Sequence, residues 1–200
     1  MTAEPDPSRL YVNVRRHSAS SGSMVVAFLW GLAEATLFFI VPDVYLGFVA
    51  LFHWRNGLLA TLAALAGAMI GGAILYALAA SDGAAVSQLL VRIPLISPEM
   101  VRAVAEQMQE NGLAAMVSAP LQGVPYKIYA AQAGQQQLPF IPFLLVTVLA
   151  RLERTLPVAL AGAAFGKVFK RFVQRRTALV TGTYALLWVG VYVVYYLLKC

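Results

Sequence analysis

Two long stretches without a charged residue, 57–80 and 177–198, constrain this chain more than any other feature of its sequence. As an α-helix, residues 57–80 would be about 36 Å long, which exceeds the roughly 30 Å hydrocarbon core of a bilayer. Apolar residues make up 60% of the chain and charged residues 12%, whereas soluble domains average roughly 45–50% and about 25%. We therefore expect an all-α integral membrane protein, and exclude a soluble enzyme, a disulfide scaffold and a disordered chain.

The basic residues, which give the chain a net charge of +6, gather in two polar segments. One is the lead of residues 1–23, with Arg9, Arg15 and Arg16, and the other is residues 167–176. Because Lys and Arg beside membrane spans favour the cytoplasmic side, we expect both segments there. Their charge would attract anionic lipid headgroups, and we do not expect it to bind nucleic acid.

Residues 24–54 form an apolar segment that is interrupted by Glu34 and then by Pro42 and Asp43. Proline lacks a backbone donor and disfavours helix in the residue before it, so we expect a break near Pro42. Unbroken, residues 24–52 would be about 43 Å long, and the part after the break is too short to cross alone. Two structures fit: a tilted, kinked span, or a re-entrant hairpin that enters and leaves the membrane on one side.

Residues 113–138 repeat this design, because Pro125 is followed by Lys127 as Pro42 is followed by Asp43. Broken segments in corresponding positions of two halves point to a binding site near the membrane midplane of a transporter.

Three full spans are expected, at 57–80, 139–165 and 177–199. The first has a stripe of small residues, including Gly67 and Gly71, that would let a second helix approach closely. In the last, Tyr192, Tyr195 and Tyr196 are expected in the aromatic belt at the membrane interface.

The polar interruption between the halves, residues 81–112, contains the signals of a helix at 97–111. Ser97 is suited to cap it, and Pro98 and Glu99 suit its first turn. Apolar residues then line one face and charged residues the other, which predicts an amphipathic helix at the membrane interface.

The charge of this interruption also bears on the topology. The two basic segments lie on the same side of the membrane if both broken segments are hairpins, or if both cross it fully. If only one crosses, the basic segments lie on opposite sides, so we expect the two broken segments to behave alike. Residues 81–112 contain few Lys or Arg, so we expect them outside. This favours two re-entrant hairpins that enter from opposite faces, with three transmembrane helices.

Six ionisable side chains fall at membrane depth in this arrangement. A charge at the bilayer centre costs about 2.5–3.5 kcal/mol, so six unpaired ones would cost on the order of 15–20 kcal/mol. They must therefore pair or face water, either as structural ion pairs or as the lining of a polar cavity. The six are Glu34, Asp43, Lys127, Arg151, Glu153 and Arg154.

Catalytic, metal-binding and cofactor-binding motifs are absent from the sequence. His17 and His53, the two histidines, fall outside the expected spans, and Cys200 is the single cysteine. We therefore expect neither an enzyme nor a bound metal or cofactor.

Several short motifs resemble the DedA superfamily of membrane proteins, which contain the VTT or SNARE-associated Golgi-type domain. They are Glu34-Ala-Thr-Leu with Pro42-Asp43, Gly123-Val-Pro-Tyr-Lys127 with Gly134, Arg151-Leu-Glu-Arg154, and the glycines from Gly162 to Gly166. The likeness covers roughly residues 28–166 and is nearest to the short YqaA-like branch. It implies inverted repeats with two re-entrant hairpins in a bacterial cytoplasmic (inner) membrane, and transport of phospholipids or lipid phosphates such as a polyprenyl phosphate.

The resemblance also assigns residues. Glu34 and Asp43 resemble the family's acidic pair, and Lys127 takes roughly the place of an arginine in the second motif. The sequence departs from the family's two-arginine pattern in the second motif, because residues 119–126 contain no arginine.

The site that we predict combines these residues with the geometry of a helix. Lys127, Arg151 and Arg154 would bind an anionic headgroup, most simply a phosphate, because guanidinium offers a rigid fork of donors. Glu153 would orient one arginine, and Glu34 or Asp43 would exchange a proton during transport. Partners would then be membrane lipids and protons, and a homo-oligomer is compatible with this. The alternative is a non-transporting scaffold or assembly factor in which the buried ion pairs are structural.

Overall fold

The structure, a computed structural model, describes residues 8–199, and its regular elements there are all helices. Helices of the first half are α1 (Arg9–Ala19), α2 (Ser21–Thr36), α3 (Asp43–Phe52), α4 (Trp54–Ser81), α5 (Gly83–Leu90) and α6 (Pro98–Asn111). The second half contains η1 (Gly112–Ala114), α7 (Ala115–Gln122), α8 (Tyr126–Gln135), α9 (Phe140–Val168), α10 (Lys170–Arg175) and α11 (Thr177–Lys199). The expected all-α class is confirmed for this part of the chain.

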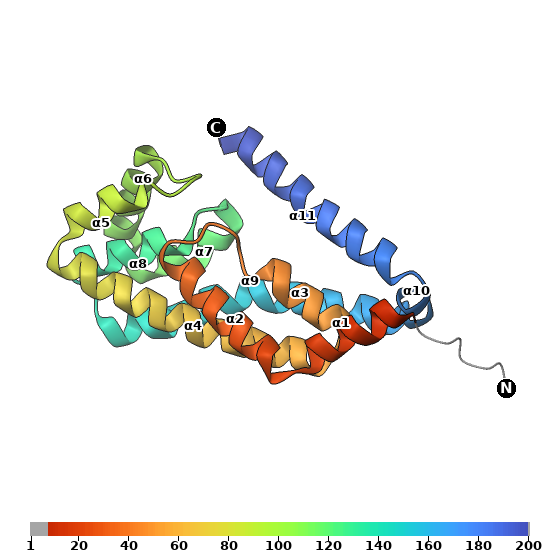
Figure 1. Cartoon of the computed structure of the whole chain (residues 1–200). Helices are drawn as coiled ribbons and strands as arrows, with labels where there is room; N and C mark the ends of the chain where they lie inside the picture. Colours follow the sequence, from red (N-terminus) through yellow and green to blue (C-terminus); the bar gives the residue numbers. More distant parts are fainter. Residues whose placement is uncertain (1–7, 200) are drawn as a thin grey trace.

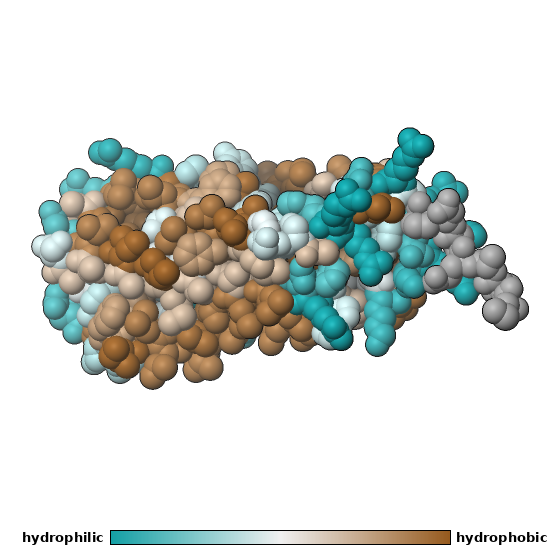
Figure 2. All heavy atoms as spheres, turned by 60° about the horizontal axis from the view of Figure 1, so that its bottom comes forward, coloured by the Kyte–Doolittle hydropathy of each residue, from teal (hydrophilic) through white to brown (hydrophobic). Residues whose placement is uncertain are grey.

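Two of these helices, α4 and α11, are long and apolar enough to cross a membrane. Only 11% of the apolar stretch of α11 is buried, so this helix is not the core helix of a soluble fold. Large apolar side chains such as Ile70, Leu145 and Leu186 are exposed on α4, α9 and α11. Figure 2 shows hydrophobic side chains over the middle of one face and hydrophilic ones toward both ends, most densely beside α1 and α10.

The chain folds back at its first helix break, between α2 and α3 (Figure 1). Tyr11, in α1, the helix that precedes α2, lies against Phe52 at the end of α3, with their ring centroids 6.1 Å apart. The break spans residues 37–42, and Pro42 is the N-cap of α3. The Trp30 indole N–H donates to the carbonyl of Ile40 over 2.9 Å and satisfies one backbone group that the break exposes.

A second break, between α7 and α8, folds the chain back in the same way (Figure 1). Gln136, which follows α8, donates from its side-chain amide to the carbonyl of Ala105 in α6, the helix before η1 and α7. Gly123 stands at φ +66° in this break, a left-handed conformation that favours glycine, and Pro125 caps α8. Both breaks therefore occur where the prolines predict them.

The two halves pack crosswise. The second limb of the first fold-back, α3, packs against α9, and the second limb of the other, α8, packs against α4. The main buried apolar cluster surrounds α8, with Tyr129, Ile128 and Phe143 at its centre. Each half therefore supplies a long helix on which the other half's short helix rests.

Three segments differ from the sequence expectation. The polar lead contains α1, and the polar interruption contains α5 before α6. Helix α6 does begin at Pro98 with Ser97 as its N-cap. Its apolar face, however, is buried against the protein through Val101, Val104 and Met108, rather than left free for a membrane interface.

Close helix approach at the small residues of α4 is confirmed. A Cβ atom added at Gly67 would lie 2.0 Å from the carbonyl oxygen of Phe28, and one at Gly31 of α2 would lie 2.1 Å from that of Ala64. The helices α2 and α4 can therefore cross this closely only because both contribute glycine at the crossing.

We predict that Gly67→Ala lowers the free energy of unfolding by about 1–3 kcal/mol, because α2 must move to admit the methyl group. Gly190→Ala is the matched control: it lies in α11 with open space around it, and alanine should be neutral or stabilising there. Thermal unfolding of the purified variants in detergent measures both. Equal stability of the two variants would contradict the packing.

Candidate functional site

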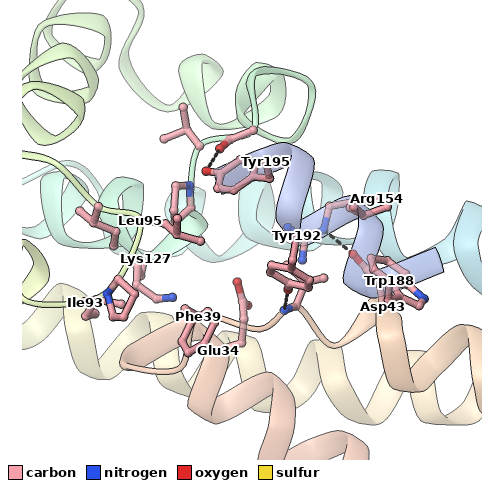
Figure 3. A pocket seen from close by; sticks show the side chains of 17 residues that line it. Glu34, Phe39, Asp43, Ile93, Leu95, Lys127, Arg154, Trp188, Tyr192 and Tyr195 are labelled. Carbon is pink, nitrogen blue, oxygen red and sulfur yellow. Dashed lines mark hydrogen bonds and ion pairs between the residues drawn. The ribbon is translucent and has the colours of Figure 1, made fainter. Parts of the chain in front are cut away.

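A cavity of about 220 Å³ lies between the two helix breaks, below the C-terminal half of α11 (Figure 3). It is lined by Glu34 near the end of α2 and Asp43 at the start of α3, on either side of the first break. Lys127, just after the second break, and Arg154, in the middle of α9, line it as well. The other lining residues come from the breaks, from residues 93–96 and from α11: Phe39, Val41, Ile93, Pro94, Leu95, Ile96, Gly123, Val124, Pro125, Trp188, Val191, Tyr192 and Tyr195.

Glu34, near the end of α2, forms a buried ion pair with Arg151 in the middle of α9. A carboxylate oxygen lies 2.5 Å from a guanidinium nitrogen, and the two side chains are 3% and 4% exposed. The Arg151 guanidinium also lies over the ring of Tyr126, 5.1 Å from its centroid. Glu34 lines the cavity and Arg151 does not, so the pair joins α2 and α9 at the cavity wall.

Asp43, the first residue of α3, pairs with Arg154 one turn further along α9. Its Oδ2 accepts from Arg154 Nε over 2.9 Å. The other carboxylate oxygen, Oδ1, and the Arg154 Nη2 atom are buried without a hydrogen-bond partner. Both residues line the cavity, so this pair keeps unused hydrogen-bonding capacity beside it.

Lys127 is the one cation of the cavity lining that forms no ion pair with a described residue. Its side chain is buried, and its ammonium group donates to the carbonyl of Phe38 in the first break over 2.8 Å. Among the described residues it forms no ion pair, because the two carboxylates of the cavity pair with the arginines. A buried ammonium group has three donors, and a single carbonyl satisfies only one.

The sixth charge lies elsewhere. Glu153 is exposed on another face of α9 and is not among the residues that line the cavity. The structure therefore brings five of the six predicted site residues together: Glu34, Asp43, Lys127, Arg151 and Arg154. Three cations against two carboxylates leave this cluster with one positive charge in excess.

The aromatic residues of α11 were not predicted to belong to the site. Tyr192 accepts a hydrogen bond from the backbone N–H of Val41 over 2.7 Å, and Tyr195 donates to the carbonyl of Gly123 over 2.7 Å. Each tyrosine thus holds α11 to one of the two breaks, as Figure 3 shows. Tyr196 is exposed, so of the three tyrosines expected in an interfacial belt, two lie at the cavity instead.

A signal for this role does exist in the sequence. Tyr184, Trp188, Tyr192 and Tyr195 follow one another at intervals of four, four and three residues, so they share one face of α11. On this face, the hydroxyl group of Tyr184 donates to the carbonyl of Val44 at the start of α3 over 2.9 Å. The stripe therefore marks the face of α11 that covers the site.

The two histidines have structural partners. The ring of His53 accepts a hydrogen bond from the backbone N–H of Asn56 and so caps α4. His17 lies 3.1 Å from the hydroxyl of Tyr45. Neither of them lines the cavity.

No protein-family model, curated protein or solved structure matches this chain.

We predict that replacing one member of the Glu34–Arg151 pair lowers the free energy of unfolding more than replacing both members does. Glu34→Leu or Arg151→Met alone leaves one buried charge and should lower the free energy of unfolding by about 3–5 kcal/mol. The double variant should recover most of this loss. Thermal unfolding in detergent measures the coupling through a double-mutant cycle.

Glu153→Leu, on the exposed face of the same helix, serves as the control and should leave stability nearly unchanged. A double variant that is as unstable as the sum of its parts would show that the two residues do not act as a pair.

Proposed function

We propose that this protein is an integral membrane transporter that moves the anionic headgroup of a lipid across the bilayer. The observation that carries the proposal is Lys127, a buried ammonium group at the edge of a cavity that forms no ion pair with a carboxylate of the described residues. An uncompensated buried charge is costly, so the cavity beside it suits an anion. In a membrane, the anions at hand are lipid headgroups.

The proposed architecture is that of the DedA superfamily, with inverted repeats and two re-entrant hairpins. Its support is the fold-back at each proline break and the crosswise packing of α3 on α9 and α8 on α4. We place α1 and α10 at the cytoplasmic face of a bacterial inner membrane, because their basic residues favour that side. The breaks would then meet near the midplane, where freed backbone groups and buried charges can share one polar site.

A phosphate is the headgroup chemistry that the site suits best. The Arg154 Nη2 atom is buried without a partner, and guanidinium donors match phosphate oxygens well. Lys127 would add a compact point charge from the facing break. Arg151 is committed to Glu34, so we assign it to holding the site together and give the binding to Lys127 and Arg154.

We predict that Lys127→Gln abolishes transport of a lipid phosphate while the protein still folds, because glutamine keeps a donor for Phe38 and loses the charge. The assay is movement of fluorescent phosphatidic acid across vesicles that contain the purified protein, with fluorescent phosphatidylcholine for comparison. Lys167→Gln, exposed near the end of α9, is the matched control and should retain transport.

The alternative of a non-transporting scaffold predicts a different outcome. If wild-type protein moves neither lipid, or if Lys127→Gln matches Lys167→Gln, the charges of the cluster are structural and the transport proposal fails.

A second part of the proposal is that transport is coupled to protons through Asp43. Its Oδ1 is buried, unpartnered and beside the cavity, whereas Glu34 is held by Arg151. A proton can bind at the free Oδ1 while Oδ2 still accepts the hydrogen bond from Arg154, and the carboxyl group then loses its charge.

We predict that collapsing a proton gradient with an ionophore slows transport by wild-type protein several-fold and has little effect on Asp43→Asn. Asparagine keeps an acceptor for Arg154 and cannot exchange the proton. Glu153→Gln is the control and should respond as the wild type does. An Asp43→Asn protein that keeps the full response to the gradient would exclude this carboxylate as the coupling group.

A further inference from the structure

An open apolar groove of about 730 Å³ lies next to the cavity, lined by α11, by residues in and beside the first break and by Pro94 and Leu95. None of the described residues that line it is charged. Several are exposed to the surroundings, among them Val189, Val193 and Leu197. Its volume falls within the roughly 300–1,000 Å³ typical of small-molecule sites, so the groove can hold an apolar group of substantial size.

The groove and the cavity share one wall. Five residues line both: Phe39, Pro94, Leu95, Trp188 and Tyr192. Leu95 stands at φ 70°, a left-handed conformation that is rare for a residue other than glycine, and it is held there against the site. A charged compartment and an apolar one are therefore separated by a layer of side chains.

This pairing matches the two parts of a lipid. The cavity, at about 220 Å³, is below the usual volume of a small-molecule site, so it can admit a headgroup and not a whole lipid. The positive excess of the cluster draws the anionic end, and the apolar groove accommodates the hydrocarbon end. A soluble phosphate would make no use of the groove.

We propose that the groove holds the hydrocarbon chain of the lipid whose headgroup occupies the cavity. The headgroup then enters sideways, past Tyr192, between α11 and the first break. Helix α11 can move aside for the headgroup because little of it is buried. In its C-terminal half, the hydroxyl groups of Tyr192 and Tyr195 form one hydrogen bond each with the breaks. This inference rests on the proposed function, and its test separates the two.

The test compares two probes that share a headgroup, hexanoyl- and oleoyl-lysophosphatidic acid. Native mass spectrometry of the purified full chain in detergent measures the affinity for each. Val189→Trp fills the groove, and Val194→Trp places the same ring on another part of α11 that lines neither compartment. The two valines are 59% and 55% exposed, so neither change disturbs a core.

We expect Val189→Trp to lower the affinity for the oleoyl probe roughly tenfold and to leave the affinity for the hexanoyl probe unchanged. A tenfold loss corresponds to lost contact for about two methylene groups. Val194→Trp should bind both probes as wild type does. If Val189→Trp and Val194→Trp give the same ratio of affinities for the two probes, the groove is not the chain site and the inference is overturned.

Lys127→Gln distinguishes a failure of the proposed function from a failure of the groove. This substitution should lower the affinity for both probes by a similar factor, because they share the headgroup. If it changes neither while Val189→Trp still weakens the oleoyl probe, the groove binds a chain and the headgroup site is wrong.

Discussion

The buried ion pair between Glu34 and Arg151 is the interaction on which the site depends. It ties the end of α2, where the first helix break begins, to the middle of α9. With both side chains almost inaccessible, each charge is tolerable only because the other is present. The pair therefore fixes the register of α2 against α9, and with it the position of Asp43 one break later.

From that anchor the remaining charges separate into distinct roles. Asp43 and Arg154 form a pair with spare hydrogen-bonding atoms beside the cavity, and Lys127 reaches across to the carbonyl of Phe38. The second break thus contacts the first through a cation and a backbone oxygen. The five-residue cluster has one positive charge in excess, and Lys127, which lines the cavity, forms no ion pair with a described residue. These two observations are the basis for proposing an anionic ligand.

The sequence allowed the helical class, the two breaks and the gathering of five charges to be predicted, because each follows from a local rule. Pro42 and Pro125 predicted the breaks. The energetic penalty for an isolated buried charge predicted that Glu34, Arg151 and their neighbours would meet. Which carboxylate pairs with which arginine was beyond local rules, since Arg151 and Arg154 are one turn apart and only the tertiary fold separates them. Glu153 could be set apart only once the faces of α9 were known.

The role of α11 escaped prediction for a different reason. Its tyrosines suit an interfacial belt equally well, and only the fold places Tyr192 and Tyr195 on backbone groups that the breaks expose. Similarly, the apolar face of α6 looks like a membrane-surface helix until α8 is seen to cover it. Amphipathic patterns identify a buried face without identifying what buries it.

The proposed transport requires the two breaks to face each other from opposite sides of a membrane. Labelling of single cysteines with a membrane-impermeant maleimide on intact cells tests this directly, with Gln88→Cys in α5 and Arg175→Cys in α10, both exposed positions, in a Cys200→Ser background. The account predicts that Gln88→Cys is labelled from outside and that Arg175→Cys is labelled only after the cells are opened. Equal labelling of the two positions in intact cells would contradict it.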